Sequence, residues 1–85
     1  ALSLFRTIGD KNNETLTLNN LGVAYLSAGD NQKALEFFNQ ALPLFRLTGN
    51  KSGEAFVLNN LGQIYESIGE NSKALESYQQ ALSLF

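Results

Sequence analysis

The 85-residue sequence predicts an all-α fold of stacked, antiparallel helix pairs, and three observations lead to this prediction. The chain repeats itself, because residues 1–40 aligned with residues 41–80 give 22 identical pairs out of 40. Glycine recurs at regular intervals between segments that have helical apolar spacing. No segment of useful length alternates polar and apolar residues as a strand does. Two helices per period are typical of an α-solenoid, in which neighbouring units share a core.

The repeat also sets the predicted domain organisation. After two full periods, the last five residues (Ala-Leu-Ser-Leu-Phe) repeat the first five. A chain that starts and ends inside a unit is what a fragment of a longer array looks like. We therefore expect one solenoid fragment over residues 1–85, with 1–9 as the tail of a preceding helix, 10–49 as the first repeat and 50–85 as the second repeat, truncated in its second helix.

Glycines and capping residues predict the helix boundaries. Residues 1–8 are expected to be helical and to end at Gly9, because glycine adopts the left-handed C-cap conformation at little cost. Asp10 is then a possible N-cap of the next helix. The following helices are expected from about Asn12 to Ala28, from Asp30 or Asn31 to about Leu47, from Asn50 to Ile68 and from about Asn71 to the chain end, separated by Gly29, Gly49 and Gly69.

The apolar faces indicate how the helices assemble. At about 100° per residue, one face of the first long helix carries Leu18, Leu21, Gly22, Tyr25 and Ala28. The next helix has an apolar arc too wide for one partner, so it must pack against its own mate and against the following unit. This arc contains Ala34, Leu35, Phe38, Ala41, Leu42 and Phe45.

Three special residues lie within these helices. Gly22 and Gly62 recur amid the packing, and we expect them to let two helices approach closely. Pro43 lies on the polar face of its helix, where we expect a kink rather than a break.

Composition excludes several classes of function. The chain has no cysteine and no histidine, so disulfides, thiol chemistry and the commonest metal ligands are excluded, and we expect neither a metal nor a cofactor. The net charge is −2, which leaves no basic face for nucleic acid. No apolar run approaches the ~20 residues of a membrane span, and no signal pattern starts the chain. We therefore expect a cytoplasmic protein without nucleic-acid or membrane partners.

A family resemblance follows from the motif Leu18-x2-Leu21-Gly22-x2-Tyr25, followed by Ala34-x3-Phe38 and Ala41. This motif resembles the tetratricopeptide repeat pattern, and the second period matches it again with Leu58, Leu61, Gly62, Tyr65, Ala74, Tyr78 and Ala81. The usual tryptophan is replaced by Leu18 or Leu58, and the trailing proline by Arg46. The period of roughly 40 residues, rather than about 34, is similar to the repeats of kinesin light chain, spindle-orienting scaffolds and large bacterial multirepeat proteins, of which the bacterial kind is nearest.

The resemblance implies a right-handed superhelix whose first helices line a concave groove for peptides of partner proteins. A second stripe of these helices would face that groove. Leu26 and Ser67 belong to this stripe, together with the predicted peptide-contacting residues. The predicted peptide-contacting residues are Leu16, Asn19, Asn20, Val23 and Ser27 in the first repeat and Phe56, Asn59, Asn60, Gln63 and Glu66 in the second. Asparagine amides can pair with the backbone of an extended peptide. The alternative, that they only join neighbouring repeats, stays open.

Some relatives hold acidic C-terminal tails with a carboxylate clamp. The clamp needs lysine where this chain has Asn19 or Asn59, and asparagine where it has Val23 or Gln63. The match fails, which disfavours an acidic C-terminal tail as the ligand.

The sequence gives no sign of an enzyme. Glu14 with Glu54, or Glu66 with Glu70, could be imagined as paired acids, but glutamates near helix starts are favourable dipole partners. The leading hypothesis is a non-catalytic scaffold that binds a protein or peptide. The alternatives are a structural spacer in a longer array, self-association by end-to-end stacking or terminal-helix exchange, and, more remotely, an RNA-reading repeat.

Overall fold

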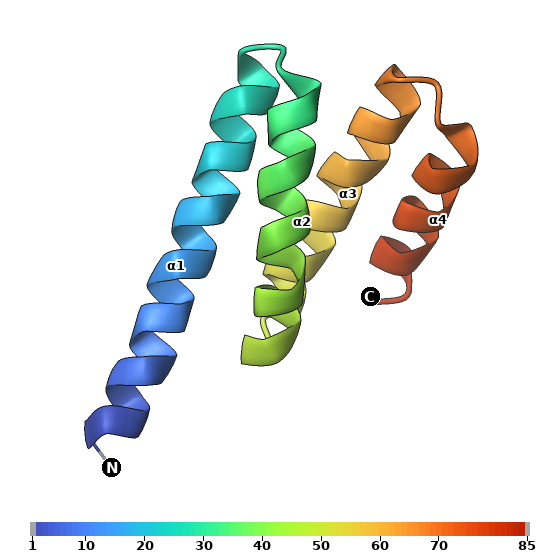
Figure 1. The fold of residues 1–85 in the computed structure, drawn as a ribbon. Coiled ribbons are helices and arrows are strands. Elements are labelled where there is room, and N and C mark those ends of the chain that lie inside the picture. Colours follow the sequence, from blue (N-terminus) through green and yellow to red (C-terminus); the bar gives the residue numbers. More distant parts are fainter. Residues whose placement is uncertain (1, 85) are drawn as a thin grey trace.

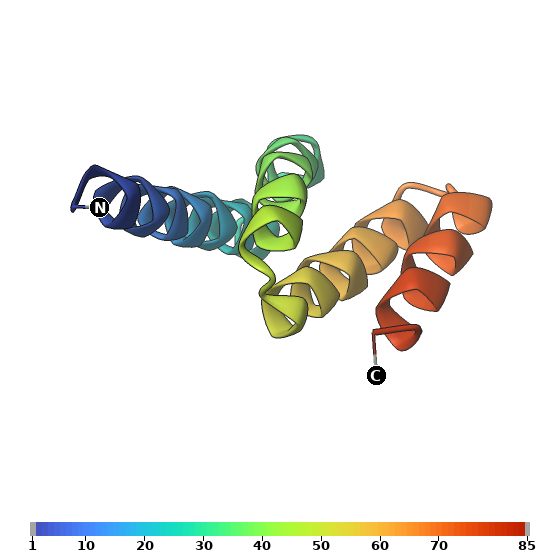
Figure 2. The same cartoon turned by 90° about the horizontal axis from the view of Figure 1, so that it is seen from below.

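The computed structural model describes residues 2–84, and its side-chain detail begins at residue 10. This part of the chain forms four helices: α1 (Leu2–Ser27), α2 (Asn31–Thr48), α3 (Lys51–Ser67) and α4 (Asn71–Leu82). The pairs α1–α2 and α3–α4 are antiparallel hairpins, and α3 packs against α2 (Figure 1). Seen from below, the hairpins are inclined to one another (Figure 2). No strand occurs between residues 2 and 84, and the prediction of an all-α helical-repeat solenoid is confirmed.

The three turns between the helices use the same backbone arrangement. Gly29, Gly49 and Gly69 have φ angles of 82°, 72° and 84°, where a side chain would be strained. After the first of these glycines, the Asp30 amide donates a 2.9 Å hydrogen bond to the Tyr25 carbonyl, and the same bond recurs at 2.9 and 2.7 Å in the other two turns. These bonds satisfy carbonyl groups that a helix end leaves free. A glycine just after each of the first three helices therefore predicts all three turns.

The helix starts differ in their caps. The Asp30 side chain accepts a 3.1 Å hydrogen bond from the Lys33 amide, and Asn50 accepts a 2.9 Å bond from the Gly53 amide. Glu70 stands at the equivalent place before α4 and makes no such bond. Aspartate and asparagine have the short side chains that suit an N-cap, so α4 begins with weaker support than α2 or α3.

The predicted helix end at Gly9 is wrong, because α1 runs without interruption from Leu2 to Ser27. The α2–α3 turn shows what is missing. Gly53 packs against the Phe45 ring there, and a Cβ added at Gly53 would lie closer to the ring than real Cβ atoms do. The equivalent position in the first repeat, 40 residues earlier, is Asn13. Its side chain would collide with an aromatic ring that lay as close as Phe45 lies to Gly53. In the α2–α3 turn the left-handed Gly49 is followed four residues later by Gly53, whereas Gly9 is followed by Asn13.

The continuous helix also affects the expected repeat boundary. The first turns of α1 extend beyond the end of α2 (Figure 1), and residues 2–9 form one helix with residues 10–27. The boundary expected at residue 9 is therefore not marked by a turn. The division into repeats 10–49 and 50–85 stays a prediction.

The core lies along α2 and α3. Its buried residues come from both helices: Ala34, Phe38, Ala41, Phe45, Val57, Leu61 and Ile64. A Cβ on Gly22 would lie 2.8 Å from the Phe38 ring, and one on Gly62 would lie 2.6 Å from the Tyr78 ring. The expectation that these two glycines permit close helix approach is confirmed. Full burial of a large apolar side chain such as Phe38 contributes roughly 1.5–3 kcal/mol.

The apolar face of α1 is more open than expected. Leu18 and Tyr25 pack against the core, but Leu21 is 38% exposed and Ala28 is also exposed. Leu61, the equivalent of Leu21, is only 2% exposed. The expected packing of Leu21 and Ala28 is wrong, because α3 lies between two helices whereas α1 has a described helix on one side only.

Pro43 does not break α2. The helix continues to Thr48, and the proline is exposed to solvent. Leu42 and Phe45 on either side of it still pack in the core. The prediction of an unbroken helix is confirmed, and the kink stays a prediction.

Candidate peptide-binding surface

The predicted contact residues lie on α1 and α3, the first helices of the two hairpins. On α1, Leu16 is 52% exposed, and Asn20 and Ser27 are also exposed. Asn19 and Val23 are partly buried, and Val23 packs against the core. Val23 therefore contributes to the packing of the hairpin, and the open part of α1 is a mixed apolar and amide surface.

The two equivalent asparagines Asn19 and Asn59 have different environments. The Asn19 Oδ1 atom is buried and has no hydrogen-bond partner within the described residues. A buried carbonyl without a donor costs roughly 1–3 kcal/mol. Asn59 is exposed, so its amide is open to a ligand.

The predicted residues on α3 form the more accessible row. Asn60 is partly buried. The other four are exposed and recur at helical spacing, so they share one face of the helix: Phe56 (45%), Asn59, Gln63 and Glu66. Gln63 and Glu66 line an open depression together with Ser67. The α3 row thus combines an aromatic ring, two amides and one carboxylate.

Glu66 connects this row to α4. The Tyr78 hydroxyl donates a 3.2 Å hydrogen bond to Glu66 Oε2. Burial of the phenol, followed by the hydrogen bond and the charge of Glu66, raises the pKa of Tyr78 above its ordinary value. At neutral pH the phenol is therefore a stable donor that orients the carboxylate.

The predicted contact residues contain no lysine or arginine, and their only charge is that of Glu66. Two of the lysines lie over aromatic rings instead: Lys33 Nζ is 5.7 Å from the centroid of Tyr25, and Lys73 Nζ is 5.7 Å from that of Tyr65. The surface therefore carries one negative charge and no positive charge.

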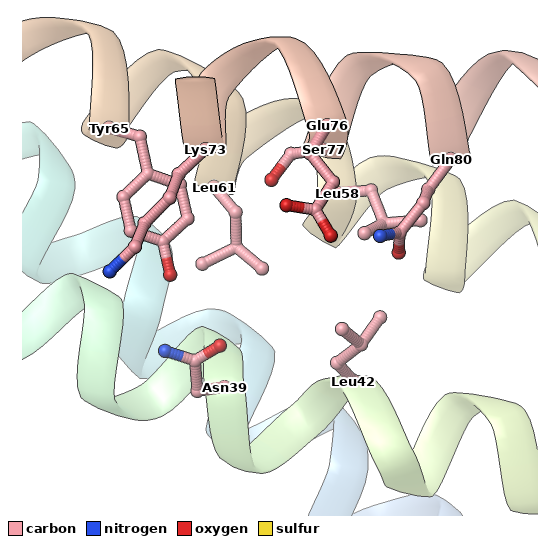
Figure 3. Close-up of a pocket in the computed structure, with 9 residues that line it drawn as sticks. All are labelled: Asn39, Leu42, Leu58, Leu61, Tyr65, Lys73, Glu76, Ser77 and Gln80. Atoms are coloured by element: carbon pink, nitrogen blue, oxygen red, sulfur yellow. The ribbon is translucent and has the colours of Figure 1, made fainter. Parts of the chain in front are cut away.

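A second concave surface, which the sequence did not predict, lies between α2, α3 and α4 (Figure 3). This α2–α4 pocket has a volume of about 270 Å³ and is lined by Asn39, Leu42, Leu58, Leu61, Tyr65, Lys73, Glu76, Ser77 and Gln80. In Figure 3, Asn39 and Leu42 of α2 face the residues of α3 and α4 across open space. Its base is aliphatic and its edges are polar.

Arg46 holds the helices around this pocket together. Its Nε atom donates a 2.9 Å hydrogen bond to Glu54 of α3, and its Nη2 atom donates a 3.3 Å bond to Gln80 of α4. The Arg46 side chain is 48% exposed, so the ion pair with Glu54 contributes at most ~1 kcal/mol. Its two bonds link α2 to both α3 and α4.

One difference between the sequences of the two repeats could have predicted the α2–α4 pocket. Phe37 of α2 stacks on Tyr25 of α1, with ring centroids 5.4 Å apart and ring planes 4° from parallel. The residue 40 positions later is Ser77. The ring that covers Tyr25 therefore has no equivalent beside Tyr65.

Two further findings concern the described residues. They contain no group of three or more aspartates, glutamates, histidines or cysteines that could hold a metal ion. Among the four helices of residues 2–84, none is both long and apolar enough to cross a membrane.

The structure thus shows two helical hairpins, each closed by a glycine on its first helix against an aromatic residue on its second. The family model described as tetratricopeptide repeat matches residues 1–47 and residues 14–85, which together span the whole sequence. The chain belongs to the tetratricopeptide repeat family. These repeats generally mediate protein–protein interactions, and the family is typically a non-catalytic scaffold.

The comparison with curated proteins found no match to this tetratricopeptide-repeat chain. Its resemblance to the longer repeats of kinesin light chain and of bacterial multirepeat proteins stays a prediction.

Proposed function

We propose that this tetratricopeptide-repeat chain binds an extended segment of a partner protein across α1 and α3, without catalysing a reaction. The binding surface consists of Leu16, Asn19, Asn20, Val23 and Ser27 on α1 and Phe56, Asn59, Asn60, Gln63 and Glu66 on α3. The exposed row on α3 is the observation that carries the proposal, because it places ligand-accessible groups at regular spacing on one helix face.

The chemistry of the row defines the ligand. Each amide of Asn59 and Gln63 offers two donors and one acceptor, which can pair with the main chain of an extended peptide of any sequence. Phe56 supplies apolar contact area for one side chain of the peptide. Glu66 favours a basic residue near it, so we expect a neutral or basic peptide with apolar side chains.

Selection of binders from a random peptide library against the chain tests this proposal. For the selected peptides, Asn59→Ala with Gln63→Ala should weaken binding by roughly 5- to 150-fold, because each lost hydrogen bond is worth about 0.5–1.5 kcal/mol. Fluorescence anisotropy measures the affinity. Asn20→Ala with Asn60→Ala tests the second pair of asparagines in the same assay.

A matched control uses amides that lie on the other helices. Gln32→Ala with Gln79→Ala removes two exposed amides from α2 and α4 and should leave the affinity unchanged. Peptides whose binding ignores the α3 row, or a selection without binders, would support the spacer hypothesis instead.

A second candidate function is association between copies of this chain, and the exposure of α4 supports it. Leu75 and Leu82 are 59% and 74% exposed. Their equivalents on α2, Leu35 and Leu42, are partly buried and pack against the core to which α3 contributes. The α1 helix of a second copy would pack on α4 as α3 packs on α2.

The contact of α3 with α2 within one chain also indicates how strong such association would be. At the places where α3 has Val57 and Ile64, both fully buried, α1 has the exposed residues Thr17 and Ala24. The contact between copies would therefore bury less apolar surface than the internal contact. We therefore expect association only at high concentration.

Two blocked variants test this arrangement by sedimentation equilibrium. Leu75→Glu with Leu82→Glu blocks the α4 face, and Thr17→Glu with Ala24→Glu blocks the α1 face. Head-to-tail packing predicts that neither variant associates alone, whereas their mixture forms a one-to-one complex. Dimers of the second variant alone would indicate symmetric pairing of α4, and dimers that persist on dilution would indicate exchange of a terminal helix. A wild-type chain that is monomeric at millimolar concentration would refute association.

A further inference from the structure

We propose that the α2–α4 pocket binds an aromatic side chain of a partner peptide, stacked on Tyr65. The pocket is separate from the peptide-binding row proposed above, because it opens between α2 and α4 and uses Leu58, Leu61 and Tyr65 of α3. It would therefore give the chain a second recognition site with its own specificity.

The first hairpin contains a filled version of the site. There the phenyl ring of Phe37 lies parallel to the ring of Tyr25, at a centroid distance of 5.4 Å and an interplanar angle of 4°. Offset stacking of two aromatic rings at 4.5–7 Å contributes about 0.5–1.5 kcal/mol beyond the burial of surface. In the first hairpin, the tyrosine of the repeat thus serves as a platform for a phenyl ring.

The second hairpin keeps the platform and lacks the ring. Tyr65 is equivalent to Tyr25, and Lys73 lies over it at 5.7 Å just as Lys33 lies over Tyr25. Because the lysine coexists with Phe37 in the first hairpin, Lys73 does not prevent stacking in the second. Ser77 has a hydroxymethyl side chain where Phe37 has a benzyl side chain, and the pocket is found at this place.

The pocket has the size and walls that a benzyl group needs. Its volume is about 270 Å³, whereas a closed apolar cavity of about 150 Å³ already binds benzene. Leu58 and Leu61 form a base that is 2% exposed, and Leu42 of α2 faces them (Figure 3). The first hairpin has no described helix in the place of α2, so only the second site is enclosed by a third helix.

The rim of the pocket favours a peptide over a free hydrocarbon. Asn39, Glu76 and Gln80 line it from both sides. Their amides and carboxylate can accept and donate hydrogen bonds to the main chain on either side of an aromatic residue. Lys73 and Glu76 carry opposite charges, so the rim selects neither acidic nor basic neighbours. The occupant is therefore a phenylalanine side chain within a peptide.

The test uses N-acetyl-L-phenylalanine amide as the probe and follows the methyl NMR signals of the 85-residue chain. We expect saturable shifts at Leu42, Leu58 and Leu61, with a dissociation constant on the order of 1 mM. N-acetyl-L-leucine amide should bind about 2- to 12-fold more weakly, because it cannot stack on Tyr65.

Two substitutions of serine by phenylalanine on α4 provide a matched pair. Ser77→Phe places the missing ring in the pocket and should weaken probe binding at least tenfold. Ser72→Phe makes the same change at an exposed position outside the pocket and should leave binding unchanged. If Ser77→Phe does not fold by circular dichroism, Tyr65→Leu removes the platform instead and should abolish the preference for phenylalanine over leucine.

Several outcomes would overturn the proposal. These are the absence of saturable shifts, shifts confined to other helices, equal affinity for the two probes, or unchanged binding to Ser77→Phe. Phe56→Ala should not affect the probe, so a failure of the α3 row as a peptide site and a failure of this pocket can be told apart.

Discussion

The α1–α2 and α3–α4 hairpins share more than half of their aligned residues and yet bury different ones. α3 lies between α2 and α4, and it buries Val57 and Ile64 completely. α1 has Thr17 and Ala24 at these places, and both are exposed. The repeat motif therefore determines the shape of each hairpin, whereas the residues between the motif positions follow from what lies beside the hairpin.

The largest expected effect tests this difference directly. Ile64→Ala should lower the free energy of unfolding by about 2–5 kcal/mol, because it opens a cavity in a fully buried site. The reciprocal change, Ala24→Ile, adds a side chain at an exposed site and should change stability by about 0.5 kcal/mol or less. Urea unfolding followed by circular dichroism measures both. Equal effects of the two changes would contradict the different burial of α1 and α3.

The turn between α2 and α3 can be made to resemble the region around Gly9. Gly53→Asn introduces the residue found at position 13 and should cost about 1–3 kcal/mol, because its Cβ forces the Phe45 ring out of place. Ser52→Asn, at the exposed neighbouring position, is the control in the same unfolding assay. A stable Gly53→Asn variant would refute the steric explanation for the continuous α1.

The helix caps provide the next comparison. Asp30→Ala removes the hydrogen bond to the Lys33 amide and should cost about 1 kcal/mol. Glu70→Asp should raise the free energy of unfolding by about 0.3–1 kcal/mol, because it supplies the shorter hydrogen-bond acceptor that α4 lacks. Thermal unfolding of the two variants beside the parent checks the opposite signs, and a loss of stability in Glu70→Asp would contradict this account of the α4 cap.

The smallest effect concerns alkaline pH and Tyr78. The pKa of Tyr78 is higher in the folded chain than its ordinary value of 10.0. The contribution of the neutral phenol is therefore fully present below about pH 10, and it is lost as the pH rises through the folded pKa. Tyr78→Phe, which has no titrating group, should lose less stability between pH 9 and about pH 11.5 in urea unfolding. An unchanged pH dependence would contradict the raised pKa.

Local sequence signals predicted most of the fold. Gly29, Gly49 and Gly69 mark the turns because the left-handed conformation depends on one residue and its immediate neighbours. Gly9 carries the same local signal, but the turn it would form depends on contact between a helix and the residue four positions beyond the glycine. Asn13 would obstruct that contact, and the periodicity of apolar residues gives no information about it.

The candidate site could be predicted only in part. Spacing alone places Phe56, Asn59, Gln63 and Glu66 on one open face of α3. The same spacing does not reveal that Val23 packs against the core, because its partial burial depends on residues that are distant in the sequence. The α2–α4 pocket was missed because none of its residues is unusual by itself, and its cause is the difference between Phe37 and Ser77.

Arg46 has a mechanical consequence. Its bonds to Glu54 and Gln80 link α2 to both helices of the second hairpin. In a stack of such units, the small rotation at each junction sets the pitch of the whole superhelix. Because the bond to Glu54 is an ion pair with one exposed partner, dissolved salt screens it. We therefore expect this link between α2 and α3 to weaken as ionic strength rises.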